Sequence, residues 1–391
     1  MPIDRELVRA ALPSLEGQTY LNTGGAGPLT VAAAEELHAA ADRSLAAGRM
    51  SLAAVERGDA MVAGLRADLA TLLGGVPEDV AVTVNTTHGV NAVVWGIDWL
   101  PGDAVVTTAL EHPGLAAPLA TLARRRDVRL EVIGAAEAEA DLAGAVARRV
   151  GPRTRLVALS HVAYGTGALL DVAGAARAAR RAGALTLVDG AQAVGAIPVA
   201  PAALGVDAYA FPSHKWLLGP EGLGGLWISE ECRERLEVTF AGYESGTDHL
   251  PGGAFTPWPA ARRLELSTPP FDLVPAWRAS LSWLAALGWD EVHRGTAAAA
   301  ARAREALAGV PGVRLVTPAG TAGLVAFTAE GRDPPEVCRA LARRGVIIRW
   351  IDHPSVLRLS AGFFTDDEDL ARLVAALATP PSTTPGAPAN G

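Results

Sequence analysis

The sequence predicts an α/β protein with a large domain, built on a mostly parallel mixed sheet, and a smaller C-terminal α/β domain. Short, nearly continuous apolar runs alternate with Ala- and Leu-rich stretches of helical periodicity over most of the chain. That pattern is typical of buried parallel strands covered by helices on both faces. Pro269, Pro270 and Pro275 interrupt it, and a second, shorter series of helices and strands follows. A length of 391 residues suits two domains.

The strands of the large domain are predicted where apolar residues stand together between helical patterns. These strands are Val80–Val84, Ala104–Thr108, Leu156–Leu159, Leu185–Val188, Ala208–Phe211 and Gly225–Ile228. The helical patterns between them include Leu115–Arg126, Leu142–Val150 and Val172–Ala182. The second series is a helix at Ala276–Leu287, a further long helix, a strand at Leu324–Thr328, a helix at Pro335–Arg344 and a strand at Val346–Trp350.

From these patterns we expect a large domain over residues 15–268 and a small domain made of residues 1–14 and 269–379. Residues 380–391 are rich in Pro, Ser and Thr, which predicts a disordered tail. The sequence shows no internal repeat.

Composition narrows the range of partners and compartments. The net charge of −8 disfavours nucleic acid or an anionic membrane as the main partner. No apolar run is long enough to span a bilayer, and the N-terminus has no signal-peptide core. Cys232 and Cys338 lie far apart and lack the short spacing of metal ligands. We therefore expect a cytoplasmic protein without a disulfide framework or a metal site.

A lysine and an acid carry the strongest chemical signal. Lys215 follows the strand that ends at Phe211 and is surrounded by apolar residues, which favours a low pKa and a nucleophilic amine. Such an amine forms a Schiff base with a carbonyl cofactor. Asp189 ends the preceding strand, and a carboxylate there can pair with a pyridinium nitrogen. Together they indicate a pyridoxal 5'-phosphate enzyme.

Two further segments follow predicted strands and can face the same crevice at the strands' carboxyl ends. Thr86 and Thr87 precede a helix, where hydroxyls and free N–H groups suit a phosphate, although such residues often serve only as a helix cap. His112 follows Glu111, and a histidine at a strand end is often structural rather than catalytic.

At this point the sequence resembles the class V aminotransferase family of fold-type-I pyridoxal-phosphate enzymes, and among them most the cysteine/cystine C–S lyases. The resemblance runs from Tyr20 to Ser360. It rests on an ordered set of motifs: Thr86-Thr87, Glu111-His112, Ser160-His161-Val162, Asp189-Gly190-Ala191-Gln192 and His214-Lys215-Trp216.

The resemblance implies a role for each matching residue. Lys215 is the Schiff-base lysine and the base for the Cα proton, Asp189 pairs with the pyridine nitrogen, and His112 stacks on the ring. Gln192 bonds the ring oxygen. The residues expected to contact the phosphate are Thr86, Thr87, Ser213 and His214. Thr268 matches a segment that reaches the phosphate of the partner subunit, which implies a homodimer with shared active sites. The amino-acid substrate is expected at Arg358, which grips the α-carboxylate, and at Arg349, Asn22, Gly25 and Tyr164.

The sequence also departs from the family's pattern. Pro212 stands where members often carry a phosphate-binding serine, and Ser213 is expected to compensate. Tyr164 stands where desulfurases often have an asparagine; it is either a hydroxyl donor to substrate or a packing residue. Desulfurases place their persulfide-forming cysteine in the loop after Arg349, and residues 350–356 contain no cysteine.

The predicted reaction is therefore β-elimination from cysteine or an S-conjugated cysteine, giving a thiol, pyruvate and ammonia. Other reactions on the same cofactor stay open: decarboxylation-coupled oxidative deamination, transamination and epimerisation. A non-catalytic binding protein that kept the fold is a second class of function. It predicts loss of the lysine or the acid, and both are present.

Overall fold

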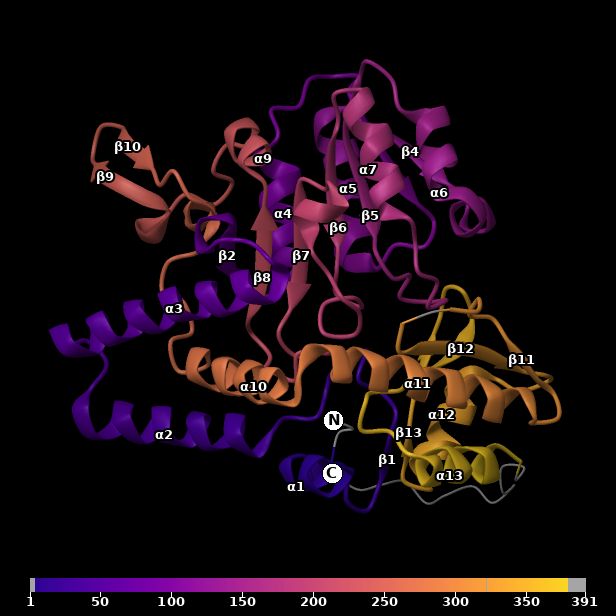
Figure 1. The fold of residues 1–391 in the computed structure, drawn as a ribbon. Helices are drawn as coiled ribbons and strands as arrows, with labels where there is room; N and C mark the ends of the chain where they lie inside the picture. The colour runs from indigo at the N-terminus through magenta and orange to yellow at the C-terminus, as the bar shows by residue number, and fades with distance from the viewer. Residues whose placement is uncertain (1–3, 321, 379–391) are drawn as a thin grey trace.

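The computed structural model describes residues 4–320 and 322–378 and has the predicted α/β architecture (Figure 1). Its larger sheet has seven strands, in the order β2 (Val80–Thr83), β8 (Gly224–Ile228), β7 (Ala208–Pro212), β6 (Leu185–Asp189), β5 (Thr154–Ser160), β3 (Ala104–Thr108) and β4 (Arg129–Ile133). The neighbours from β7 to β4 are parallel, and β8 is antiparallel to both β2 and β7. Two reversals leave β2 and β7 running in the same direction. Their carboxyl ends therefore meet at one edge of the sheet.

Side chains on the central strands alternate between two hydrophobic cores, as the pleat of a strand requires. Val157 and Leu159 face one core, whereas Leu156 and Ala158 face the other. The first core is covered by α3 (Leu52–Leu73), α6 (Ala135–Arg149), α7 (Val172–Arg181) and α10 (Val274–Leu287); the second is covered by α4 (Thr86–Gly96), α5 (Pro113–Arg126) and α9 (Glu230–Arg235). Both faces are buried, which explains the near-continuous apolar runs in the sequence.

Two elements of the large sheet differ from the prediction. Strand β4 was not expected, because it lies at the sheet edge and carries Arg129 and Glu131 between its apolar residues. Helix α6 is interrupted at Asp141, whose φ and ψ are non-helical, so the helix predicted from Leu142 matches its second part, whereas the part that begins at Ala135 was not predicted. Its first turns carry Glu137 and Glu139, which hide the apolar stripe from a pattern search.

The smaller sheet is antiparallel, in the order β11 (Val313–Leu315), β12 (Leu324–Ala329), β15 (Val356–Ser360) and β14 (Arg349–Ile351). It packs against α11 (Trp289–Ala308), α12 (Pro334–Ala342) and α13 (Asp367–Ala378). The strand predicted at Val346–Trp350 is wrong as a single element. Its first half is β13 (Val346–Ile347), which pairs in parallel with β1 (Thr19–Tyr20), while Arg349 begins β14 and pairs with β15.

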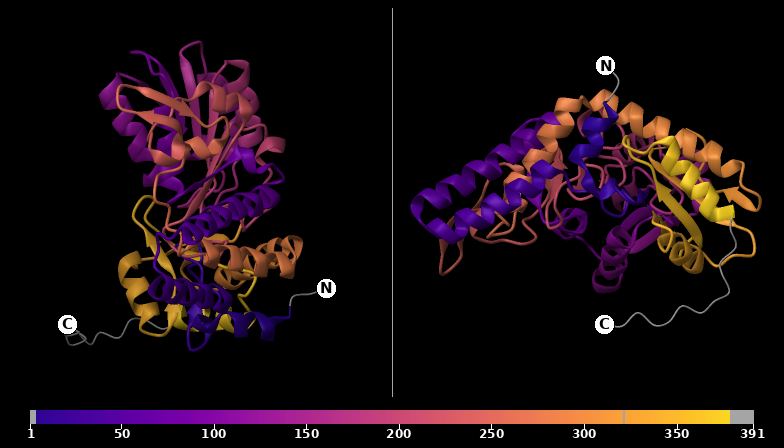
Figure 2. Two further views of the ribbon diagram at one scale, coloured as in Figure 1. Left: turned by 90° about the vertical axis from the view of Figure 1, so that its left-hand side faces the viewer. Right: turned by 90° about the horizontal axis from the view of Figure 1, so that it is seen from below.

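The remaining elements surround these two sheets. They are α1 (Arg5–Ala11), α2 (Val31–Ala47), α8 (Pro201–Leu204), the hairpin of β9 (Gly246–Leu250) and β10 (Ala254–Pro257), and short 3-10 helices at Pro13–Leu15, Pro77–Asp79, Tyr243–Ser245 and Ala261–Leu264. Helices α10 and α11 run one after the other beneath the large sheet, and the hairpin stands apart from it (Figures 1 and 2). Within the described residues, no helix has both the length and the apolar character needed to cross a membrane. The domain boundaries stay a prediction, and residues 380–391 lie outside the described residues.

Candidate active site

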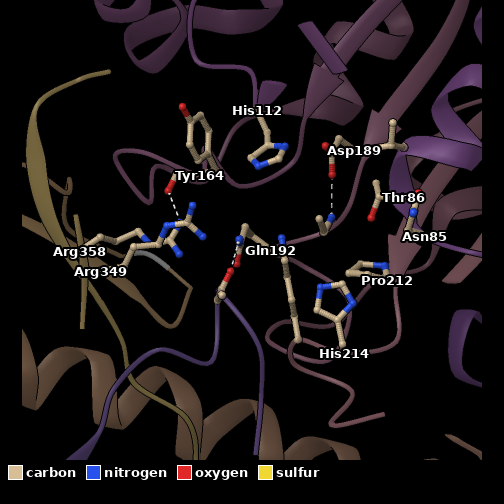
Figure 3. A pocket seen from close by; sticks show the side chains of 15 residues that line it. Asn85, Thr86, His112, Tyr164, Asp189, Gln192, Pro212, His214, Arg349 and Arg358 are labelled. Carbon is tan, nitrogen blue, oxygen red and sulfur yellow. Dashed lines mark hydrogen bonds between the residues drawn. The ribbon is translucent and has the colours of Figure 1, made fainter. Parts of the chain in front are cut away.

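A cavity of about 290 Å³ lies at the carboxyl edge of the large sheet (Figure 3). It receives side chains from the segments that follow β2, β3, β5, β6 and β7, and from β14 and β15. It brings together eleven of the residues predicted from the sequence: Gly25, Thr86, Thr87, His112, Tyr164, Asp189, Gln192, His214, Lys215, Arg349 and Arg358. Strand-end reasoning therefore located the cavity.

Three predicted residues do not line the cavity. Ser213 is fully buried, and its hydroxyl donates to the carbonyl oxygens of Pro220 and Leu223. The chain bends directly after β7, and there Pro212, His214 and Lys215 line the cavity while Ser213 does not. Asn22 does not line the cavity but packs beside Gly25, which does. A Cβ added at Gly25 would lie 2.7 Å from the Asn22 amide nitrogen. Thr268 is exposed and adopts a φ of 54°.

Four lining residues were missed: Gly24, Asn85, Ala191 and Pro212. Asn85 is the N-cap of α4, and its side-chain oxygen accepts a hydrogen bond from the His88 N–H at 2.8 Å. An Asn directly before two threonines and a helical pattern is a capping signal that the sequence offered.

Lys215 lines the cavity. Burial, together with the positive charges of Arg358 and Arg349, outweighs the attraction of Asp189 and lowers the pKa of the Lys215 amine to about 8. Gly27 packs directly against the backbone of Lys215, since a Cβ added at Gly27 would lie 2.2 Å from the Lys215 carbonyl oxygen. Lys215 is also the only lysine in the 391-residue chain. The cavity thus holds the one side-chain primary amine that the protein possesses.

Asp189 is the last residue of β6 and is buried, with 5% of its surface exposed. Its carboxylate accepts a hydrogen bond from the Ala191 N–H at 2.9 Å. Burial raises the pKa of Asp189, while this hydrogen bond and the charge of Lys215 act in the opposite direction. A carboxylate held in this way is suited to a cationic partner inside the cavity.

The start of α4 suits an anion. Thr86 is the first residue of α4, and Thr87 the second, so unpaired N–H groups and hydroxyls meet at the positive end of the helix dipole. His214 also lines the cavity. Its Nδ1 atom is buried and has no hydrogen-bond partner among the described residues. An orphaned ring nitrogen at this point fits a bound oxyanion.

His112 is held as a neutral imidazole. Its Nδ1 accepts a hydrogen bond from the Gly114 N–H at 2.9 Å, which leaves the ring proton on Nε2. Burial and the nearby positive charges of Lys215, Arg349 and Arg358 lower the pKa of His112 to about 4. The ring is therefore uncharged at neutral pH and presents an aromatic face rather than a cation.

The preceding residue anchors this histidine. The Glu111 carboxyl accepts hydrogen bonds from the hydroxyls of Thr108 and Ser160, both at 2.6 Å, and so fixes the segment after β3 to the end of β5. Burial raises the pKa of Glu111 to about 7. The sequence marked Glu111 only as part of a motif; the structure places it behind the cavity wall.

The other end of the cavity carries two guanidinium groups. Arg358 in β15 is 1% exposed; its Nη1 donates to the Tyr164 carbonyl oxygen at 2.7 Å. Its Nε and Nη2 atoms have no partner among the described residues. Burial and the neighbouring Arg349 lower the pKa of Arg358 to about 9, so the group stays charged at neutral pH. Buried charge with two free donors fits a carboxylate ligand.

Tyr164 links this end to His112. The two rings meet edge to face, with centroids 4.9 Å apart. The Tyr164 hydroxyl donates to the carbonyl oxygen of His353 at 3.2 Å, in the turn between β14 and β15. Tyr164 therefore packs against His112 and donates to the main chain, and a contact with substrate stays a prediction.

The two cysteines lie elsewhere. Cys232 is 0% exposed and Cys338 6% exposed, and neither lines the cavity in the part of the chain that the structure describes. Burial raises the pKa of both thiols. Both are poor nucleophiles in this state.

Comparison with known proteins decides the family. A model of the family "Aminotransferase class-V" matches residues 26–373. The chain belongs to the class-V aminotransferase family. It is 33% identical over 379 residues to isopenicillin N epimerase of Streptomyces clavuligerus, covering 91% of this chain and 93% of that protein. It is 32% identical over 328 residues to a probable cysteine desulfurase of Pseudomonas aeruginosa, covering 78% and 79%.

Solved structures of this class-V protein's relatives confirm the fold-type-I architecture. The cystine C–S lyase C-DES, in complex with its reaction product cysteine persulfide, superposes with a TM-score of 0.89 at 32% identity, covering 94% of this chain and 99% of that one. A lysine-to-alanine mutant of C-DES, with glycine covalently linked to its PLP cofactor, has a TM-score of 0.90 at 32% identity, covering 95% and 98%. The fold and family predictions are confirmed.

Proposed function

We propose that this class-V enzyme is a pyridoxal 5'-phosphate-dependent C–S lyase that eliminates sulfur from cysteine or an S-substituted cysteine. The observation that carries the proposal is the set of groups in one cavity: a lone low-pKa amine, a buried carboxylate and a buried arginine with free donors, without a thiol among the described lining residues. The similarity to the cystine C–S lyase C-DES and to a probable cysteine desulfurase supports it.

The cavity residues fit the cofactor. The Thr86 and Thr87 end of α4 and the orphaned His214 Nδ1 suit the phosphate, and the Asp189 carboxylate suits the ring nitrogen. His112 offers a neutral ring face. When bound, pyridoxal 5'-phosphate supplies an electron-withdrawing ring that acidifies the Cα–H bond of an amino acid attached through its nitrogen.

The chain's own residues then perform the elimination. Arg358 binds the α-carboxylate through its two free donors, which orients the Cα–H bond toward the Lys215 amine. Lys215 takes the Cα proton as the base. The Cβ–S bond breaks, and the sulfur leaves with the bonding electron pair and is protonated. The remaining three-carbon enamine reacts with water to give pyruvate and ammonia, so no oxidant or reductant is needed.

Cofactor capture should depend on pH through Lys215. Only the neutral amine attacks an aldehyde, and with a pKa of about 8 the neutral fraction grows with pH and then levels off. The capture rate should therefore rise about tenfold per pH unit below pH 8 and change little above it. Rapid mixing of cofactor-free protein with pyridoxal 5'-phosphate, followed by borohydride trapping and peptide mapping, measures this at the single lysine. A rate that still climbs between pH 9 and 10 contradicts the lowered pKa.

Product analysis tests the proposed reaction. The holoenzyme is incubated with cysteine, with cystine and with an S-alkyl cysteine, and pyruvate, ammonia and the released sulfur compound are quantified. Equal amounts of pyruvate and released sulfur compound are expected. An aldehyde with carbon dioxide, or a keto acid that retains its sulfur, would instead indicate decarboxylation-coupled deamination or transamination.

Epimerisation is the second candidate, favoured by the similarity to isopenicillin N epimerase. It uses the same base and the same carboxylate anchor, but returns a proton to Cα instead of expelling a group from Cβ. Incubation in deuterium oxide separates the two. Deuterium at Cα with a growing D-isomer and no pyruvate supports epimerisation.

We also propose a homodimer with shared active sites. Thr268, whose motif implies a contact with a partner's phosphate, is exposed and outside the cavity of its own chain. It adopts a left-handed φ of 54°, which is rare for a β-branched residue and indicates a constraint. Sedimentation equilibrium should give twice the mass of one chain, and a monomer would refute the proposal.

A further inference from the structure

The residue after the catalytic lysine holds a cavity residue in place. The Trp216 indole Nε1 donates to the Gln192 side-chain oxygen at 3.0 Å, and both side chains are 3% exposed. An indole N–H can only donate. The carboxamide atom facing Trp216 must therefore be the oxygen, which settles the orientation of the Gln192 amide.

The other end of the amide is fixed by the same logic. Gln192 Nε2 donates one of its two hydrogens to the carbonyl oxygen of Gly24 at 2.8 Å, a bond drawn in Figure 3. A flipped amide would set donor against donor at Trp216 and acceptor against acceptor at Gly24. The second Nε2 hydrogen is left over, and Gln192 lines the cavity.

The Trp216 indole also packs against Gly323, at the start of a strand of the smaller sheet. A Cβ at Gly323, directly before β12, would lie 2.3 Å from Trp216 Cη2. The Trp216 ring therefore fills the space that a side chain at this position would take. It extends from the lysine segment to the edge of the smaller sheet.

We propose that Trp216 is a positioning residue that aims the free Gln192 N–H at the ring oxygen of the bound cofactor; this inference rests on the cofactor geometry of the proposed function. A donated hydrogen bond stabilises negative charge on that oxygen. The oxygen then attracts the proton on the nearby Lys215 nitrogen less strongly. The bond therefore lowers the pH midpoint at which the cofactor's visible absorption changes.

Trp216→Phe tests this on the holoenzyme, because it removes the N–H donor and keeps an aromatic ring. The pH midpoint of the absorption change should rise by about one pH unit, the size expected for one lost hydrogen bond. The matched control is Trp277→Phe. Trp277 is fully buried and its Nε1 has no partner among the described residues, so the same substitution should leave the midpoint unchanged.

An unchanged midpoint in Trp216→Phe overturns the proposal, as does an equal rise in Trp277→Phe, which would indicate a general packing effect. If Trp216→Phe does not fold, Gly323→Ala is the second variant: its Cβ would lie 2.3 Å from the indole and 2.7 Å from the Ala361 carbonyl oxygen, and it keeps the indole N–H. A raised midpoint supports the proposal and an unchanged one refutes it. The titration uses no substrate. Failure of the lyase reaction would therefore refute the proposed function and leave this result standing.

Discussion

Lys215→Ala is expected to lower kcat by at least about 10³-fold, because in the proposed mechanism one amine both captures the cofactor and moves the Cα proton. The loss should be unusually complete, since Lys215 is the only lysine of the chain and no other side-chain amine can take its place. The variant should still hold an amino acid linked to the cofactor, as the lysine-to-alanine mutant of C-DES holds glycine. Steady-state pyruvate release and the absorption spectrum measure the two effects separately.

Two controls separate this chemistry from a loss of folding. Lys215→Arg keeps the positive charge but lacks a nucleophilic amine of low pKa, and it should be as inactive as Lys215→Ala. Added methylamine should restore part of the rate in Lys215→Ala, because a small amine can enter the space that the side chain leaves. Retained activity in Lys215→Arg would mean that Lys215 acts only through its charge.

The sequence was most informative where a strand is buried on both faces. Continuous apolar runs marked β3, β5, β6 and β7 to within two residues at each end, since a parallel strand between helix layers has no polar side to confuse the pattern. The polar residues that follow such strands, among them Asp189 and Lys215, had to meet at one edge. Strand direction therefore predicted the part of the cavity that the large sheet forms, whereas Arg349 and Arg358 were predicted only from the family resemblance.

Elsewhere the deciding contacts come from distant parts of the chain. The Ser213 hydroxyl bonds the carbonyl oxygens of Pro220 and Leu223, which lie several residues further along the chain, and it therefore does not line the cavity as its neighbours Pro212 and His214 do. The run Val346–Trp350 has the local pattern of one strand, but its halves pair with β1 and β15, which lie over 300 residues apart in the chain. The Gln192 orientation depends on Trp216 and Gly24 together. The residues near each of these positions in the sequence do not indicate such contacts.

Arg358→Gln is expected to lower kcat/KM for a cysteine substrate by about 10²- to 10³-fold, the cost of losing the charged partner of a buried carboxylate. The same change in Arg349, which lines the cavity but is exposed, should cost no more than about fivefold, as solvent-exposed ion pairs do. Thermal unfolding provides the structural control. Removing a guanidinium that is 1% exposed and has two unpaired donors should leave the Tm unchanged or raise it.

A substrate that lacks the α-carboxylate completes this test. Deleting the carboxylate should cost the wild-type enzyme about as much as Arg358→Gln does, because either change breaks the same contact. In Arg358→Gln the carboxylate has no charged partner left, so deleting it should cost little more. Arg349→Gln should still discriminate strongly between the two substrates. If Arg358→Gln also retains the wild-type preference for the carboxylate, then the anchor lies elsewhere, and Arg358 serves the cavity only through its bond to the Tyr164 carbonyl.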